Sequence, residues 1–271
     1  MQQTSPSTSL VIATYNWPEA LELCLLSVLG QKKMPDEIVI ADDGSTSATK
    51  EMIDRFRSRT MVPIQHIWHA DEGFKLAQIR NKAIVAAKSE YIIQVDGDLI
   101  LHPSFVNDHI NAAKAGHFIG GSRVILDKVL SEKTLLKKNI HHHVFTRGIS
   151  NSFNGIHSST LGKLLSFLIK TTNAYNIRGC NISYWKKDFL SVNGYNEEYK
   201  GWGREDTDLV FRFYNSGLKR VFFKLRGVAF HLWHKEADRN ALSQNDHILQ
   251  QTIHTKATST TNGSDRYTRN P

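Results

Sequence analysis

The chain has 271 residues, of which 40% are hydrophobic and 22% are charged, and its formal net charge is +8. This composition is ordinary for a soluble globular protein that is large enough to bury a core. The positive charge indicates anionic partners, such as nucleotide phosphates or anionic lipid. Because no RNA- or DNA-binding signature is present, we expect no nucleic-acid partner. Two cysteines, Cys24 and Cys180, are too few for a disulfide framework.

The sequence offers no obvious membrane-targeting segment. Residues 1–9 are polar and lack the apolar run of a signal peptide. No uncharged stretch approaches the roughly 20 residues needed to cross a bilayer. We therefore expect a cytoplasmic protein.

Strand-like and helix-like segments alternate through the first part of the chain. Strands are expected over residues 10–13, 37–41, 64–68 and 91–95. The first helix is expected to begin at Asn16 and Pro18, a side-chain cap followed by an early proline. This alternation predicts a parallel sheet covered by helices.

Polar clusters follow three of these strands. They are Thr14-Tyr15-Asn16, Asp42-Asp43 and Asp96-Gly97-Asp98. Any one of them alone is typical of a turn or a cap. Because ligands of parallel sheets bind at the carboxyl ends of the strands, the three together predict a binding site.

The chemistry of this site is limited by what the motifs contain. There is neither a G-x-G-x-x-G nor a Walker A sequence, which argues against dinucleotide enzymes and P-loop NTPases. Asp96 and Asp98 supply hard oxygen ligands without a cysteine cluster, which suits Mn²⁺ or Mg²⁺ rather than zinc. Such an ion would bridge a diphosphate.

The regular pattern fades after Arg123. His141-His142-His143 is interpreted as a solvated basic loop. A stripe at helical spacing is formed by Leu161, Leu164, Leu165, Leu168 and Ile169, flanked by Lys163 and Lys170. Such a stripe is usually core, but it also fits a lid or a membrane-surface patch for a lipid-linked acceptor.

The last third begins with residues 201–208, Gly-Trp-Gly-Arg-Glu-Asp-Thr-Asp, at the start of an expected helix that ends near Asn215. A strand over residues 228–230 then runs into His231 and His234. These two histidines can bind one metal only if the strand has ended between them. From Thr255 onward the sequence is polar and lacks an apolar period, so we expect a disordered tail over residues 255–271.

Val11-Ile12-Ala13-Thr14-Tyr15-Asn16, Asp42-Asp43-Gly44-Ser45, Arg80-Asn81 and Asp96-Gly97-Asp98 together resemble family 2 glycosyltransferases of GT-A fold. The glycine-tryptophan-glycine stretch with Glu205-Asp206 resembles the C-terminal segment of β-1,4-galactosyltransferases and of bacterial chondroitin polymerase. The resemblance covers residues 9–125 and 175–236. It implies an α/β fold in which a Rossmann-like, mostly parallel sheet is fused to an acceptor-binding and catalytic segment.

The resemblance also implies a division of the chain. Residues 1–125 would bind the UDP-sugar, and residues 126–174 would be a variable insertion that forms a lid or a membrane-surface region. Residues 175–254 would bind the acceptor and carry the catalytic base.

Site roles follow from the same resemblance. Thr14, Tyr15, Asn16 and one of Asp42 or Asp43 would hold the nucleoside, and Arg80 with Lys75 would offset the diphosphate charge. Asp96 would face the ribose and the metal, Asp98 would bind the metal, and His234 would be the third ligand, with His231 as second choice. Gly179, Asn181, Trp202 and Gly203 would contact the acceptor. Asp206 would be the base, with Glu205 as the alternative.

The predicted function is metal-dependent, inverting transfer of a sugar from a UDP-sugar to a glycan or a lipid-linked glycan. The implied setting is bacterial surface polysaccharide or lipopolysaccharide synthesis, with peripheral contact at the cytoplasmic membrane face. Two alternatives stay open. One is a sugar-phosphate nucleotidyltransferase, although residues 14–19 lack the glycines of its usual loop. The other is an inactive module that binds a nucleotide or a glycan.

Overall fold

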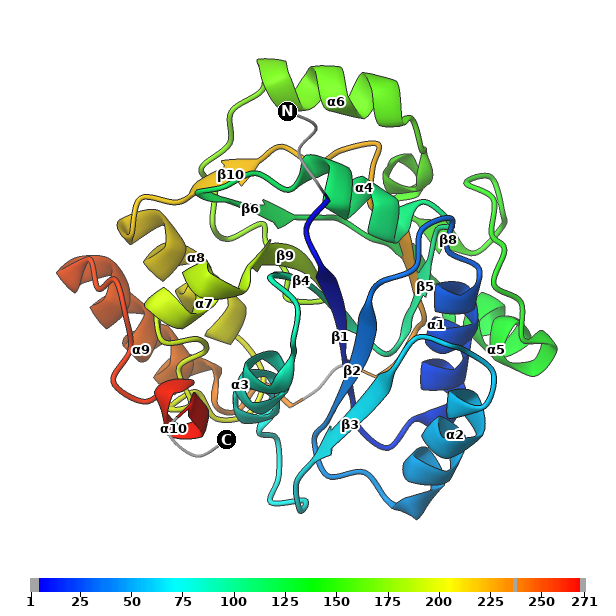
Figure 1. Ribbon diagram of the computed structural model, residues 1–271, viewed down its shortest axis with the longest axis horizontal. Helices are drawn as coiled ribbons and strands as arrows, with labels where there is room; N and C mark the ends of the chain where they lie inside the picture. Colours follow the sequence, from blue (N-terminus) through cyan, green and yellow to red (C-terminus); the bar gives the residue numbers. More distant parts are fainter. Residues whose placement is uncertain (1–4, 236–237, 269–271) are drawn as a thin grey trace.

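A central sheet organises the fold of the computed structural model, which describes residues 5–235 and 238–268 (Figure 1). Its strand order is β10-β6-β9-β4-β1-β2-β3. The strands are β1 (Thr8–Thr14), β2 (Glu37–Asp42), β3 (Ile64–Trp68), β4 (Tyr91–Asp96), β6 (His117–Gly120), β9 (Asn181–Trp185) and β10 (Lys219–Val221). The pairs are parallel except that β9 runs antiparallel to both β4 and β6. The expected α/β class with a mostly parallel sheet is confirmed.

Helices cover both faces of this sheet, because apolar side chains point to alternate faces along each strand. Leu10 and Ile12 of β1 belong to the core that includes α1 (Pro18–Leu29), α2 (Ser47–Arg57) and α4 (Phe105–Ala112). Val11 and Ala13 belong to the core of α3 (Leu76–Ala86), α7 (Lys186–Ser191) and α8 (Glu205–Asn215). The strand residues are buried on both faces, as in other parallel sheets.

A smaller sheet lies beside α1, with strand order β5-β11-β7-β8. Its strands are β5 (Leu99–Leu101), β7 (Val124–Leu126), β8 (Ile149–Ser150) and β11 (Ala229–His231). β5 follows the end of β4 closely in the chain, and β11 pairs with β5. Just after β11, Leu232 N donates to Asp98 O at 3.0 Å. This pairing brings the segment after β11 to the carboxyl edge of β4.

The sheets run across the divisions expected at residues 125 and 174. β9 fills the position between β4 and β6, and β7 pairs with β8 and β11. The intervening segment contains α5 (Lys128–Lys137), a 3-10 helix (Ser152–Gly155) and α6 (Ser159–Leu168). Among the described residues, no helix is both long and apolar enough to cross a membrane.

The expected disordered tail is wrong for the part that the structure describes. α9 (Leu242–Thr255) is followed by an ordered turn and by α10 (Asp265–Thr268). Asn193 Nδ2 donates to Thr260 O at 2.9 Å, and Ser264 is 1% exposed. Hydrogen bonds, and not an apolar stripe, hold this segment against the body. The hydrophobic periodicity of the sequence therefore could not reveal that the segment is ordered. Residues 269–271 lie outside the described part.

Candidate active site

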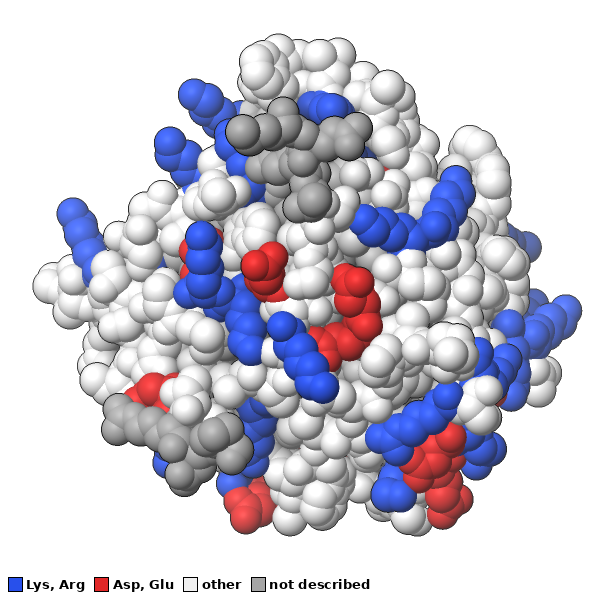
Figure 2. Space-filling view, viewed as in Figure 1, with Lys and Arg blue, Asp and Glu red and all other residues white. Residues whose placement is uncertain are grey.

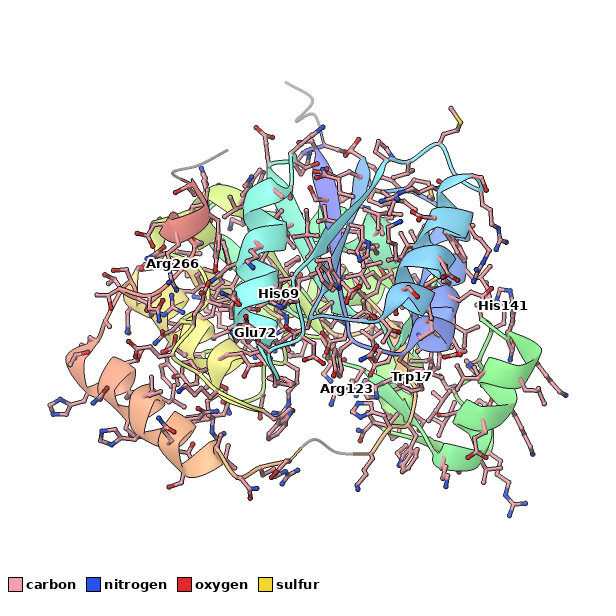
Figure 3. The ribbon with its side chains drawn as sticks, turned by 90° about the horizontal axis from the view of Figure 1, so that it is seen from below. Trp17, His69, Glu72, Arg123, His141 and Arg266 are labelled. Atoms are coloured by element: carbon pink, nitrogen blue, oxygen red, sulfur yellow. The ribbon has the colours of Figure 1, made fainter. Side chains whose placement is uncertain are left out.

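A cavity of about 380 Å³ opens at the carboxyl ends of the parallel strands. It is lined by Ala13, Thr14, Tyr15, Trp17, Ala20, Asp43, Gly73, Phe74, Leu76, Asp96, Gly97, Asp98 and His234. Figure 3 views this edge, where Trp17 and Arg123 lie at one side and His69 and Glu72 at the other. The three strand-end clusters predicted from the sequence therefore do lie together.

Of the two aspartates left open after β2, Asp43 is the one that lines the cavity. Asp42 is fully buried, and its carboxylate accepts from Ser45 N and contacts His66 Nε2, both at 2.8 Å. Asp43 contacts His69 Nε2 at 2.7 Å and accepts from Lys75 N at 3.0 Å. Burial raises the pKa of Asp43, although His69 opposes this shift. Asp42 thus supports the loop, and Asp43 faces the ligand space.

Two partly exposed aromatic rings also line the cavity. The Tyr15 side chain is 52% exposed and Phe74 is 42% exposed. Tyr15 Oη donates to Asp71 at 2.9 Å, which fixes the ring. Exposed aromatic rings beside a buried carboxylate offer a stacking surface and a hydrogen-bond acceptor to a flat heterocycle.

Asn16 was expected to cap the first helix and to contact the nucleoside, but its side chain and N–H bond to other groups. It does not line the cavity and makes no side-chain cap for α1. Its Oδ1 accepts from Thr46 N at 2.9 Å, and its N–H donates to Ser45 Oγ at 2.8 Å. Asn16 therefore ties the loop after β1 to the start of α2.

Asp98, His231 and His234 form a cluster that could hold a metal ion. Asp98 Oδ2 lies 3.3 Å from Nε2 of each histidine. Because β11 ends at His231, His234 lies beyond the strand and can turn back toward Asp98. Both histidines therefore lie beside Asp98, whereas the sequence favoured His234 as the third metal ligand, with His231 as the second choice. Asp96 lies outside this cluster.

The chemistry of these donors fits a divalent cation. His234 Nδ1 lies 2.9 Å from Lys235 O, which leaves Nε2 as the ring nitrogen that faces Asp98. Burial lowers the pKa of His231 to about 4, which keeps this imidazole neutral at pH 7. Asp98 Oδ1 is buried without a hydrogen-bond partner in the part of the chain that the structure describes. Acceptor atoms that converge in this way need a positive charge between them.

Arg80 connects the cavity to α8. Its side chain is 1% exposed; Nη2 donates to Asp96 Oδ1 at 2.8 Å, and Nη1 donates to Asp206 Oδ1 at 2.9 Å. Glu205 Oε1 lies 3.6 Å from the same Nη1. Arg80 is thus buried rather than solvated, and its guanidinium is bonded to carboxylates of the protein instead of facing the space for a diphosphate. Lys75, its expected companion, pairs with Glu72.

Asp206 accepts hydrogen bonds from three sides. Besides Arg80, Gly179 N donates to its Oδ2 at 2.7 Å and Tyr195 Oη donates to its Oδ1 at 3.3 Å. A side chain at position 179 would overlap the Asp206 carboxylate, so only glycine fits there. The carboxylate stays 20% exposed. Gly179 therefore positions Asp206, whereas the sequence had suggested contact with an acceptor.

Glu205 precedes Asp206 and is more enclosed. Burial, with Asp206 alongside, raises the pKa of Glu205 to about 8, although Arg80 opposes this shift. Its Oε2 is buried and without a partner in the described part of the chain. Glu205 is thus largely protonated near neutral pH, although it stands in the first turn of α8, where the helix dipole favours ionised carboxylates.

The loop before α8 has an unusual backbone. Gly201, Gly203 and Arg204 all have positive φ angles, of 61°, 107° and 82°. This path turns the chain so that Glu205 and Asp206 open the helix. The ring of Trp202 lies under the Arg239 guanidinium at 5.1 Å, and Gly203 O accepts from Asn245 Nδ2 at 2.9 Å.

Asn181, expected to contact the acceptor, lies buried and uses its amide on backbone carbonyls. It is 1% exposed, and its Nδ2 donates to Ser122 O at 2.8 Å and to Gly227 O at 3.0 Å. It holds the start of β9 to the loop after β6 and to the segment before β11.

Sequence reasoning missed several residues of the site. Trp17 and Phe74 line the cavity, His69 supports Asp43, and Tyr195 supports Asp206. Phe74 carried a signal, an apolar ring between Gly73 and Lys75 where no helix had yet begun. His69 and Tyr195 carried none, because only the tertiary fold brings them to their partners.

The fold and the site together define the GT-A class of glycosyltransferases. A family model described as glycosyl transferase family 2 matches residues 9–186, and one described as the N-terminal domain of galactosyltransferase matches residues 165–235. The chain belongs to glycosyl transferase family 2.

Similar proteins agree with this assignment. The chondroitin synthase of Escherichia coli is 27% identical over 229 residues, which are 77% of this chain and 32% of that protein. The chondroitin synthase of Pasteurella multocida (strain Pm70) is 24% identical, over 82% of this chain and 24% of that protein. The chain thus spans about a quarter to a third of the length of these relatives.

Solved structures show the same fold. The mannosyltransferase PcManGT of Pyrobaculum calidifontis, in complex with GDP-Man and Mn²⁺, has a TM-score of 0.62 at 14% identity. The match covers 94% of this chain and 65% of that one. GalNAc-T7 with UDP, GalNAc and Mn²⁺ has a TM-score of 0.64 at 16% identity, over 87% and 45% of the two chains.

Proposed function

We propose that this chain transfers a sugar from a UDP-sugar to a glycan or lipid-linked glycan, with a divalent cation and with inversion at the anomeric carbon. One observation carries the proposal. A single cavity is lined both by the Tyr15 and Phe74 rings with Asp43 and by Asp96, Asp98 and His234. A nucleoside and a charged diphosphate need these two environments within one ligand's length.

In this proposal Asp43 accepts from the base or ribose of the donor, and Thr14 lies beside it. Asp98, His231 and His234 would hold Mn²⁺ or Mg²⁺, which would offset the charge on the departing diphosphate. The imidazole donors favour Mn²⁺ of the two. Two similar structures, PcManGT and GalNAc-T7, contain Mn²⁺, which supports this choice.

Asp206 is the proposed base. It would take the proton of the acceptor hydroxyl as the hydroxyl oxygen bonds to the anomeric carbon and the bond to the diphosphate oxygen breaks. Arg80, Gly179 N and Tyr195 fix the carboxylate, and its exposed part can meet the acceptor. Glu205, with its raised pKa, is the weaker candidate because it is largely protonated at pH 7.

The relatives suggest a setting. The two relatives from Escherichia coli and Pasteurella multocida are chondroitin synthases. We therefore propose that the acceptor is a glycan of bacterial surface polysaccharide or lipopolysaccharide, extended at the cytoplasmic face of the membrane. The donor sugar is left open.

The test is release of UDP from a panel of UDP-sugars, with mass analysis of the product formed on glycan acceptors. We expect release that requires Mn²⁺ and stops in EDTA. Release of pyrophosphate from a sugar phosphate and UTP would instead assign a nucleotidyltransferase. UDP-sugar binding without turnover on any acceptor would leave an inactive binding module.

A further inference from the structure

α6 exposes an apolar surface that the fold leaves uncovered. Leu161 is 48% exposed, Leu164 54%, Phe167 85% and Leu168 66%. Leu161, Leu164 and Leu168 follow a spacing of three and four, so they share one side of the helix, and Phe167 lies beside Leu164. A contiguous patch of this kind is uncommon on a soluble monomer. The stripe is therefore not core packing, the more ordinary of its interpretations.

The helix is attached to the body by its other side and by its first turn. Gly162 is the buried residue of α6, and it packs against Lys224 O and the Arg226 side chain. Ser159 Oγ donates to Asp108 Oδ1 at 3.0 Å, and Ser158 N donates to Leu225 O at 2.9 Å. These contacts hold the helix in one orientation without using its leucines, so the apolar side is presented outward by the fold itself.

The sequence around α6 is basic. Residues 133–187 contain no aspartate or glutamate. Their lysines and arginines are Lys133, Lys137, Lys138, Arg147, Lys163, Lys170, Arg178, Lys186 and Lys187. Lys163 lies within the helix and Lys170 follows it.

Cations of a distant segment join them. Arg220 Nη1 donates to Asn173 O at 3.1 Å, and Lys224 Nζ donates to Asn154 Oδ1 at 2.7 Å. Both partners are uncharged and flank α6, so these contacts add positive charge beside it. In Figure 2 the surface over α6, at the top of the view, is white, with blue on its flank and the larger red clusters lower down.

We propose that α6 docks the protein onto an anionic membrane surface, lying flat with Leu164, Phe167 and Leu168 among the lipid chains. Lys163, Lys170 and Lys224 would face the lipid phosphates. An apolar stripe edged by lysines is the arrangement of interfacial helices, in which apolar burial and attraction to anionic lipid add together. The proposal goes beyond the sugar-transfer function and does not depend on it.

The experiment is sedimentation with vesicles of phosphatidylcholine alone or with added phosphatidylglycerol, using the full chain. We expect wild type to bind the anionic vesicles and to lose binding as NaCl rises. The triple variant Leu164→Ser, Phe167→Ser, Leu168→Ser should lose at least about tenfold in affinity for the anionic vesicles. The double variant Lys163→Gln, Lys170→Gln should also bind anionic vesicles more weakly, with no change toward neutral vesicles. A matched control is Met61→Ser with Leu136→Ser, two exposed residues outside α6, which should bind as wild type.

Three results would overturn the proposal. One is absence of wild-type binding to anionic vesicles, and another is equal binding of wild type to neutral vesicles. The third is a wild-type dimer in solution that the triple variant abolishes, which would assign this surface to a second copy of the chain. The melting temperature should not fall in the triple variant, since the residues are exposed; a large fall would show that they pack inside. UDP release in solution, if present, should be unchanged, so this proposal and the sugar-transfer proposal can fail separately.

Discussion

Arg80 and Asp206 are 126 positions apart in sequence, yet Arg80 Nη1 lies 2.9 Å from Asp206 Oδ1. The same guanidinium bonds to Asp96 at the end of β4. One buried cation therefore joins the edge of the donor cavity to the first turn of α8. The position of the proposed base depends on α3, an element of the other half of the chain.

We predict that Arg80→Met destabilises the protein by about 3–5 kcal/mol, because it leaves Asp96, Glu205 and Asp206 near one another without their cation. Arg80→Lys keeps the charge but cannot bond to both aspartates at once, so it should be milder in stability yet still lose turnover. Denaturant unfolding and UDP release measure the two effects. Lys82→Met, on the same helix, is the control. Wild-type stability of Arg80→Met would show that the guanidinium contributes little.

The cluster of Asp98, His231 and His234 is tested by metal binding directly. Asp98→Asn and His234→Ala should each weaken Mn²⁺ binding in the presence of UDP by about tenfold or more, since the first removes the charge of one proposed ligand and the second removes another proposed ligand altogether. Electron paramagnetic resonance of free Mn²⁺ measures this without any turnover. His247→Ala, an exposed histidine on α9, should bind as wild type. Unchanged binding in both site variants would move the ion elsewhere.

Asp206→Asn keeps the shape of the side chain and removes the base. We expect turnover to fall roughly 10²-fold or more, while UDP affinity stays within a few-fold of wild type. Circular dichroism and the melting temperature show whether the loss reflects unfolding next to Arg80. Asp54→Asn on α2 is the control. If Asp206→Asn turns over normally while Glu205→Gln is inactive, the two roles are exchanged.

Glu205 should make stability fall as pH rises. Its pKa lies near 8 in the folded protein against 4.5 ordinarily, so between these values the unfolded chain releases the proton and the folded chain retains it. The free energy of unfolding then decreases by at most about 1.4 kcal/mol per pH unit from this group. Glu205→Gln should therefore melt higher than wild type at pH 8.5, with the gap closing toward pH 5. A gap that is independent of pH would contradict the raised pKa.

Removal of residues 258–271 should destabilise the protein. Asn193 bonds to Thr260 O and to Asp265 Oδ1, both at 2.9 Å, and Glu197 N bonds to Asn262 O. Each broken bond leaves a half-buried group unpaired, at about 1–3 kcal/mol. A fall in melting temperature checks this, with Asn193→Ala as a milder version. A truncated chain that melts like wild type would restore the expectation of a tail that contributes nothing.

Local patterns were sufficient for much of the fold. β3 begins and ends at the residues expected, Ile64 and Trp68, because its isoleucines and tryptophan favour a strand and Pro63 precedes it. α8 likewise ends at Asn215, as expected. Asp43 and Asp98 were found because strand ends of a parallel sheet must meet at one edge.

What failed depended on distant partners. Arg80 reads as one more cation on a helix until Asp96 and Asp206 close around it. Gly179 reads as a flexible residue until the Asp206 carboxylate occupies the space of its missing side chain. The segment around Ser264 is polar throughout, and only the Asn193 side chain explains why it is ordered.

The place of β9 has a consequence for how such enzymes can be recombined. β9 follows α6 in the chain but lies between β4 and β6, and the residue just before it, Cys180, is preceded by the Gly179 that holds Asp206. A donor module excised at residue 125 would lack β9 and β10, so β4 would present a bare edge and β6 would lose both of its partners. Exchange of donor preference between relatives therefore has to carry β9 along, and with it the support of the proposed base. We therefore expect donor and acceptor specificity to be inherited as one unit.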